Sequence, residues 1–129
     1  MNGYRKPARI LAFIAIFAFW VWAIGYAADA KAHYKPGIHN TRHAINTAWC
    51  GRANSYCGAS SEAWRVAGCE TGGTYSVWAN NGQYLGLFQM GSFARSTYGH
   101  STNPWGQARA AHRYYVASGR DWSPWTCKP

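Results

Sequence analysis

Carboxylates are the side chains that this sequence has fewest of: its 129 residues include four aspartates and glutamates against 13 lysines and arginines. The formal net charge is +9 at pH 7, and such a charge favours anionic partners, namely nucleic acid, acidic lipid or a polyanionic cell wall. Most glycosidases place two carboxylates roughly 5–9 Å apart across the bond that they cleave. Because Asp29 lies close to the N-terminus, only Glu62, Glu70 and Asp121 are left for such chemistry. The shortage disfavours a site built from two carboxylates.

Metal-binding and nucleophile motifs are also missing. His39 and His43 are four residues apart, but they lack the glutamate of a zinc-protease helix. The four cysteines have 6, 11 and 57 residues between them, and these spacings match no common zinc pattern. There is no Gly-x-Ser-x-Gly nucleophile elbow, no phosphate-binding loop and no internal repeat. We therefore expect neither a metal nor a cofactor.

The N-terminus reads as a leader for export. Three basic residues precede a charge-free run over residues 10–28, and Ala28-Asp29-Ala30 has the form of a signal-peptidase site. Residues 1–30 are predicted to be a signal peptide or an N-terminal membrane anchor, and we favour cleavage. Both alternatives carry residues 31–129 across the membrane, since the positive end stays inside. We therefore expect a secreted or extracytoplasmic protein that meets the membrane only through an uncleaved leader and binds no nucleic acid.

An even number of cysteines in an exported chain predicts disulfides. Cys50, Cys57, Cys69 and Cys127 allow three pairings. We favour Cys50–Cys57, which closes a short local loop, together with Cys69–Cys127, which ties the residue before Glu70 to the C-terminal segment. In the chain-entropy account, the longer loop contributes about 4 kcal/mol to the free energy of unfolding.

Hydrophobic spacing and turn residues predict a mainly helical α+β chain with one hairpin. Residues 31–59 are predicted to be an arm, loose over 31–37, followed by a short helix and a disulfide loop. A second helix is predicted with Ser60 or Ser61 as its N-cap, and an Asn-Gly pair marks a hairpin turn. The expected elements, in order, are a helix over 38–49, a stapled loop over 50–60, a helix ending near Glu70, a hairpin around Asn80-Asn81-Gly82, a helix over 92–98 and a helix from Asn103-Pro104 to Ser118.

Glu70 is the strongest candidate for chemistry. Ala63, Val66, Ala67 and Glu70 share one helix face, which places the carboxyl on the apolar side in the last turn. Burial and the negative end of the helix dipole would raise its pKa, and a carboxylic acid that stays protonated is what a general acid requires. The alternatives are a surface glutamate at a helix end or a buried glutamate paired with an arginine.

The other two carboxylates are poorly placed to assist Glu70. Glu62 lies two turns earlier, roughly 12 Å along the helix axis at 1.5 Å per residue, and Asp121 falls in the C-terminal segment as a loop or capping residue. The sequence thus favours chemistry with a single acid, in which the substrate supplies its own nucleophile. Most of the eight tryptophans and nine tyrosines should belong to the core. Trp78 and Tyr84, which flank the hairpin turn, are the better candidates for stacking on a sugar.

Two blocks of sequence carry a resemblance to a family. The segment Cys69-Glu70-Thr71-Gly72-Gly73, with Gly86-Leu87-Phe88-Gln89 some sixteen residues later, resembles the lysozyme-like soluble lytic transglycosylases. The cysteine before the glutamate and the late Trp125-Thr126-Cys127 are similar to the resuscitation-promoting factors of actinobacteria. A weaker block, Asn103-Pro104 to Tyr114, looks like a later helix of the same family. The resemblance covers about residues 60–127.

The resemblance implies a small lysozyme-like domain over residues 60–129, disulfide-stapled, with a short sheet beside the catalytic helix. It implies a wall-associated monomer that binds peptidoglycan glycan strands and cleaves the β-1,4 bond from N-acetylmuramic acid to N-acetylglucosamine. Glu70 would be the acid and base that yields 1,6-anhydromuramoyl products. By position, Thr71 would orient Glu70 or the sugar, Gln89 would contact an N-acetyl group and Tyr114 would line the cleft. A muramidase that hydrolyses the same bond, and a non-catalytic wall-binding or signalling module, are the alternatives.

Overall fold

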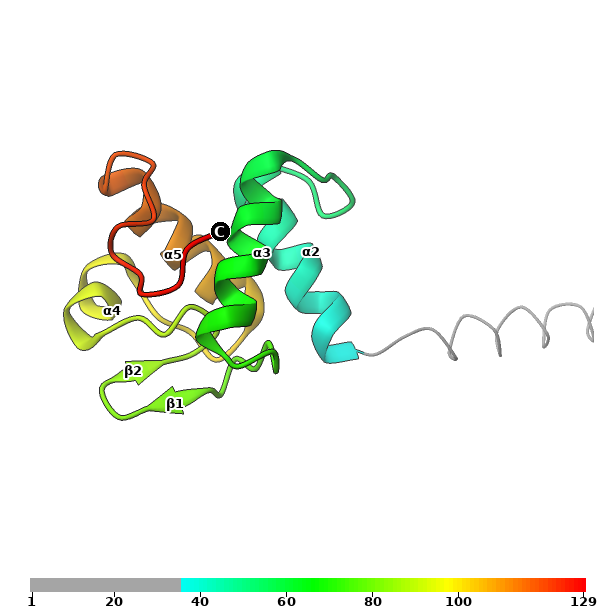
Figure 1. The fold of residues 1–129 in the computed structure, drawn as a ribbon. Helices are drawn as coiled ribbons and strands as arrows, with labels where there is room; N and C mark the ends of the chain where they lie inside the picture. Colours follow the sequence, from blue (N-terminus) through cyan, green and yellow to red (C-terminus); the bar gives the residue numbers. More distant parts are fainter. Residues whose placement is uncertain (1–35) are drawn as a thin grey trace, which may run out of the picture. The chain divides into compact units, whose positions relative to one another are not determined.

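The computed structural model describes residues 36–129 (Figure 1). The predicted leader, residues 1–30, and residues 31–35 of the predicted arm lie outside the described residues. Within the part of the chain that the structure describes, no helix is both long and apolar enough to cross a membrane.

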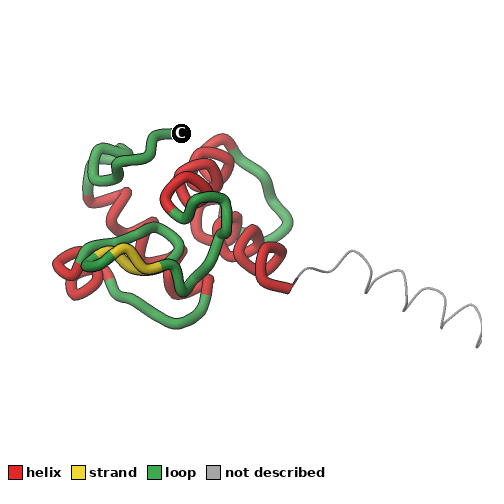
Figure 2. Tube along the Cα trace, turned by 60° about the horizontal axis from the view of Figure 1, so that its bottom comes forward, coloured by secondary structure: helices red, strands yellow, loops and turns green. Residues whose placement is uncertain are grey.

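Four helices and one two-stranded hairpin make up the described chain. Figure 2 shows how small the share of strand is beside helix and loop, so the predicted mainly helical α+β class is confirmed in this coarse form. In order, the elements are α2 (Pro36–Cys50), α3 (Gly58–Glu70), β1 (Asn80–Asn81), β2 (Tyr84–Leu85), α4 (Ser92–Tyr98) and α5 (Pro104–Ala117).

Two helix starts differ from the prediction. Helix α2 begins at Pro36 rather than at residue 38, because proline suits the first helical position, where an amide hydrogen would have no partner. Helix α3 begins at Gly58 rather than after Ser60 or Ser61. The Ser60 hydroxyl accepts a hydrogen bond from the Cys57 amide at 3.2 Å and donates one to the Cys57 carbonyl at 3.0 Å, so it caps the helix from inside the first turn.

The structure contains the two favoured disulfides, Cys50–Cys57 and Cys69–Cys127. The first joins the end of α2 to the residue before α3, and the second joins the end of α3 to the C-terminal segment. Two disulfides in so small a chain are typical of extracellular or otherwise oxidising surroundings.

The core is formed where α2 packs against both α3 and α5 (Figure 1). Small residues on α3 and α5 allow this close approach, and aromatic rings fill the space beyond them. Trp49 stacks on Phe88 at 5.5 Å and on Trp122 at 5.9 Å between ring centroids. The buried hydrophobic residues are Ala44, Ile45, Ala63, Val66, Ala67, Leu87, Phe88, Met90, Ala94, Ala108, Ala110, Ala111, Trp122 and Trp125.

Gln107 on α5 holds the segment that follows the hairpin. Its Oε1 accepts the Leu87 amide hydrogen at 2.7 Å, while its Nε2 donates to the carbonyl oxygens of Val77 at 2.9 Å and Ser101 at 2.7 Å. Gly86 is required beside it, because its φ is +81° and an added Cβ would lie 2.6 Å from Gln107 Oε1. One buried amide thus fixes the Gly-Leu-Phe-Gln segment to α5.

Replacing Gln107 with leucine should lower the free energy of unfolding by about 2–4 kcal/mol, since three backbone groups lose their partner in a buried site. Urea unfolding followed by circular dichroism measures the loss. The control is Gln83→Leu, at an exposed turn position, which should change the free energy by less than about 0.5 kcal/mol. Equal effects of the two substitutions would contradict the role given to Gln107.

His112 on α5 makes the stability depend on pH. Its ring meets Trp49 edge-on at 5.0 Å, and its pKa lies below the ordinary value of 6.5, first because of burial and then because of the Arg120 charge. The pKa of His100 is lowered as well, by burial and by Arg95. Both folded-state pKa values are depressed, so the unfolded chain binds more protons and stability is lost as the pH falls below 6.5.

We therefore expect the urea midpoint to decrease between about pH 7.5 and pH 5. The substitution His112→Gln should flatten this dependence, because it removes one of the two histidines whose pKa is lowered in the folded chain. Midpoints measured across that range for the wild-type chain and for His112→Gln provide the check. A wild-type midpoint that rises on acidification would contradict the direction of both pKa shifts.

Candidate active site

Glu70 is the last residue of α3, and the chain turns sharply after it. The Thr71 amide donates to the Ala67 carbonyl at 3.1 Å, and the Gly73 amide donates to the Gly68 carbonyl at 2.7 Å. Gly72 and Gly73 have φ values of +58° and +83°, a conformation that glycine adopts without the penalty of a Cβ atom. As the sequence predicts, the glycine pair ends the helix directly after the carboxylate.

The Glu70 side chain borders a surface hollow of about 200 Å³. The hollow lies where the end of α3, the hairpin and the C-terminal segment meet, so its walls come from three separate parts of the chain. The lining residues are Glu70, Asn81, Tyr84, Gln89, Pro124, Trp125 and Thr126. Three of the residues predicted from the sequence, Glu70, Tyr84 and Gln89, are thus brought together.

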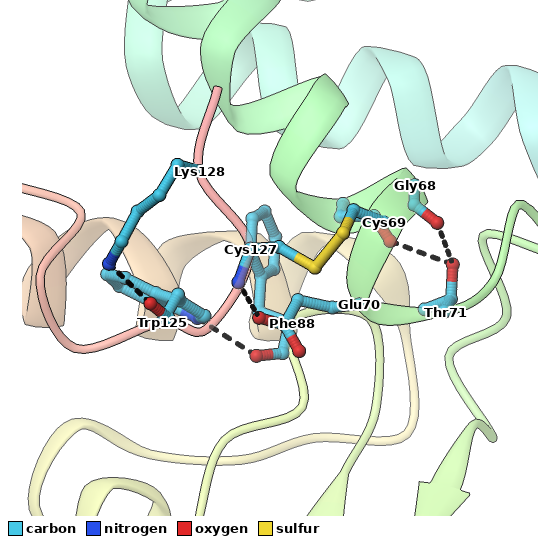
Figure 3. Close-up of a disulfide and its surroundings, with 9 residues drawn as sticks. Gly68, Cys69, Glu70, Thr71, Phe88, Trp125, Cys127 and Lys128 are labelled. Atoms are coloured by element: carbon cyan, nitrogen blue, oxygen red, sulfur yellow. Dashed lines mark hydrogen bonds between the residues drawn. A yellow bond between two sulfur atoms is a disulfide. The ribbon is translucent and has the colours of Figure 1, made fainter.

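The carboxyl group of Glu70 is held by the backbone of the C-terminal segment. Glu70 is half-buried, and its Oε1 accepts the Cys127 amide hydrogen at 3.0 Å (Figure 3). Within residues 36–129, Oε2 accepts no hydrogen bond. The Cys69–Cys127 disulfide, next to Glu70 in sequence, keeps this amide in place. One oxygen is therefore fixed, and the other is available for proton transfer.

Gln89 presents an acceptor to the hollow. The residue is 9% exposed, and its Nε2 donates to the carbonyl oxygens of Ala79 at 3.1 Å and Gly86 at 2.9 Å. Because both amide hydrogens are used, Oε1 is the polar atom that this side chain has left for a ligand.

Tyr84 supplies an aromatic wall. It is 44% exposed, and a Cβ atom added to Gly91 would lie 3.4 Å from its ring, so the ring rests against the start of α4. An exposed ring of this kind, next to a carboxyl group and an amide oxygen, suits a ligand with both flat apolar faces and polar substituents.

The other predicted binding residues lie elsewhere. Trp78 is 71% exposed and borders a second hollow of about 450 Å³, together with residues that include Ile38 and Tyr75. Thr71 is buried, and its hydroxyl donates to the Ala67 carbonyl at 2.8 Å and accepts the Tyr75 amide hydrogen at 2.9 Å. It orders the chain as it leaves α3 and does not line the Glu70 hollow.

Tyr114 lies behind the hollow rather than in it. Its ring stacks on Tyr98 at 4.8 Å and meets Trp125 at 5.1 Å between centroids. Since Trp125 lines the hollow, Tyr114 supports the wall from the core side.

The remaining described carboxylates are engaged away from the hollow. Glu62 Oε2 accepts the indole hydrogen of Trp122 at 3.0 Å. Asp121 is exposed and accepts the Ser123 amide hydrogen. Glu70 is therefore the single carboxylate that lines the hollow within residues 36–129.

Four lining residues were not predicted as binding residues, namely Asn81, Pro124, Trp125 and Thr126. A signal for two of them existed in the sequence. Trp125 and Thr126 directly precede Cys127, and the favoured disulfide ties Cys127 to the residue before Glu70. The pairing alone places the C-terminal segment beside the carboxylate.

No family model, curated protein or solved structure matches this chain. The geometry of the hollow and the sequence motifs are therefore the grounds for a function. Residues 36–129 contain no group of three or more histidine, cysteine, aspartate or glutamate side chains able to hold a metal ion. The lining of the hollow includes one carboxylate, two amide residues and two aromatic residues, namely Glu70, Asn81, Gln89, Tyr84 and Trp125. A carboxyl group in such a position can give or take a proton.

Proposed function

We propose that this protein is a lysozyme-like lytic transglycosylase of peptidoglycan, with Glu70 as its acid and base. It would cleave the β-1,4 bond between N-acetylmuramic acid and N-acetylglucosamine and leave 1,6-anhydromuramoyl ends. The observation that carries the proposal is the isolation of Glu70: it is the single described carboxylate in a hollow that also holds the Gln89 amide and the Tyr84 ring. One acid suffices where the substrate brings its own nucleophile.

The reaction divides into two proton transfers at Glu70. Because Oε1 is occupied by the Cys127 amide hydrogen, Oε2 carries the proton and donates it to the oxygen that bridges the two sugars. The bond from that oxygen to the muramoyl C1 breaks, and the N-acetylglucosamine leaves as an alcohol. The muramoyl C6 hydroxyl then bonds to C1, and its proton returns to Oε2. Water is neither consumed nor released, and the enzyme ends as it began.

Substrate contacts follow from the atoms that the walls present. Gln89 Oε1 accepts the hydrogen of an N-acetyl amide, and the exposed Tyr84 ring packs against a sugar face. The resemblance implies that Thr71 orients Glu70 or the sugar and that Tyr114 lines the cleft. We propose instead that Thr71 orders the chain after α3 and that Tyr114 packs against Trp125.

The leader, the disulfides and the charge of the chain agree with an exported enzyme that acts on the cell wall. The predicted leader carries the domain out of the cytoplasm, and the two disulfides suit an oxidising compartment. Without residues 1–30, ten lysines and arginines remain against three aspartates and glutamates, a net charge of +7, which favours retention on a polyanionic wall.

Digestion of purified peptidoglycan tests the proposal. We expect soluble muropeptides to appear without a matching rise in reducing ends, because each cleavage closes an anhydro ring. A muramidase would release one reducing end for each cleavage. A wall-binding module would bind the wall and release nothing, and either of these results would overturn the proposal.

A further inference from the structure

The C-terminal wall of the Glu70 hollow belongs to neither a helix nor a strand. Residues 122–127 carry Trp125, Thr126 and the Cys127 amide that meets Glu70. An irregular segment makes few regular backbone hydrogen bonds of its own, so side chains must fix its course. Trp125 does so in part, because its indole hydrogen is donated to the Phe88 carbonyl at 2.9 Å.

Lys128 closes this segment into a turn. Its Nζ donates to the carbonyl oxygens of Trp122 at 2.7 Å and of Ser123 at 3.3 Å. It also donates to the carbonyl oxygen of Trp125 (Figure 3). An ammonium group has three donors, and here all three are directed to backbone carbonyls of one turn. Hydrogen bonds from a charged donor are stronger than neutral ones. The Lys128 ammonium group therefore links three backbone carbonyl groups of the same turn.

Lys128 directly follows the residues that contact Glu70 and line the hollow. Cys127 precedes it and donates to Glu70, while Trp125, whose carbonyl it holds, lines the hollow. The Cys69–Cys127 disulfide anchors one point of the segment. The indole hydrogen bonds of Trp125 and Trp122 anchor it at two further points, and Lys128 fixes the conformation of the turn between these points.

We propose that Lys128 is a positioning residue for the Glu70 site. It holds Trp125 and Thr126 as the wall of the hollow and keeps the Cys127 amide on Glu70 Oε1. The expected effect on kinetics rests on the proposed function, whereas the role of Lys128 in holding the segment does not.

The test compares Lys128→Met, which keeps the length of the side chain but removes the donors, with Lys128→Arg, which keeps charged donors. The matched control is Arg109→Met, which removes one positive charge at an exposed position of α5. Steady-state kinetics on a soluble glycan oligomer are measured together with amide hydrogen exchange at Cys127 and at Val66 in the core.

For Lys128→Met we expect KM to rise about tenfold, because the wall is displaced, and Cys127 exchange to accelerate while Val66 exchange is unchanged. A mere loss of folded protein would lower the apparent kcat and leave KM as it was. Lys128→Arg should restore KM to within about threefold of wild type, and Arg109→Met should match wild type throughout.

Unchanged KM and unchanged Cys127 exchange in Lys128→Met would overturn the inference. If the wild-type protein cleaves no glycan, the proposed function fails by itself, and exchange at Cys127 still decides whether Lys128 holds the segment. Faster exchange would then support the structural role, and unchanged exchange would refute it.

Discussion

Glu70→Gln should reduce the release of muropeptides from purified wall by at least about 10³-fold, within the range that general acid–base catalysis contributes. Glutamine keeps an oxygen able to accept the Cys127 amide hydrogen, so the C-terminal segment stays in place. It has no proton to give to the bridging oxygen and cannot take one from the C6 hydroxyl. Both halves of the reaction are therefore lost, while binding to the wall is retained.

The matched control is Glu62→Gln, which lies on the same helix and accepts the Trp122 indole hydrogen. Its glutamine oxygen preserves that acceptor, so activity should remain close to that of wild type. Release assays on equal amounts of folded protein, with wall binding measured by co-sedimentation, compare the two variants. Retention of more than about a tenth of the activity by Glu70→Gln would remove the carboxylate from the mechanism.

Removal of the Cys69–Cys127 disulfide should cost both stability and activity. The bond closes a loop with a sequence separation of 58 residues, so the chain-entropy account gives a loss of about 4 kcal/mol in the free energy of unfolding. Replacing both cysteines with alanine also frees the segment that lines the hollow and withdraws the Cys127 amide from Glu70. We expect a loss of activity even where the variant is fully folded.

The other disulfide provides the control. Cys50 and Cys57 are separated by 7 residues, so their replacement with alanine should cost about 2 kcal/mol. Because neither cysteine lines the hollow, kcat/KM of the folded variant should be unchanged. Urea unfolding and glycan kinetics on both double variants distinguish the cases. Equal effects on kcat/KM would mean that the Cys69–Cys127 bond has no special role at Glu70.

Local sequence signals predicted much of the helical framework. Asn103 accepts the Gly106 amide hydrogen at 2.9 Å with Pro104 following it, and α4 spans the predicted residues, Ser92–Tyr98. Such signals succeed because caps and helix-ending glycines act within one turn of the chain. The predicted start of α3 is wrong because serine is a common N-cap residue. Here Ser60 lies inside the first turn of the helix, and its hydroxyl bonds to the backbone of Cys57.

The residues of the site likewise separate into those that local patterns predict and those that they do not. Glu70 and Gln89 could be predicted, because the glycine pair after one and the Gly-Leu-Phe-Gln segment before the other are local patterns. Trp78 was grouped with them as a neighbour of the hairpin, yet the strands are only two residues long, and its side chain borders the second hollow.

The C-terminal wall could not be predicted from periodicity. Its course depends on contacts far away in sequence, from Trp125 to the Phe88 carbonyl and from Trp122 to Glu62. An irregular segment held by such contacts has no repeating pattern of apolar residues. Only the disulfide pairing pointed to its place, and one fixed point did not reveal which side chains would face Glu70.

The most direct test of the account is digestion of purified peptidoglycan in ¹⁸O-labelled water, with mass spectrometry of the muropeptides released. Closure of an anhydro ring by the C6 hydroxyl brings in no solvent oxygen. The account therefore predicts unlabelled 1,6-anhydromuramoyl ends that depend on Glu70. One ¹⁸O atom at each new muramoyl end would show that water is the nucleophile, and the single-acid mechanism proposed for Glu70 would be wrong.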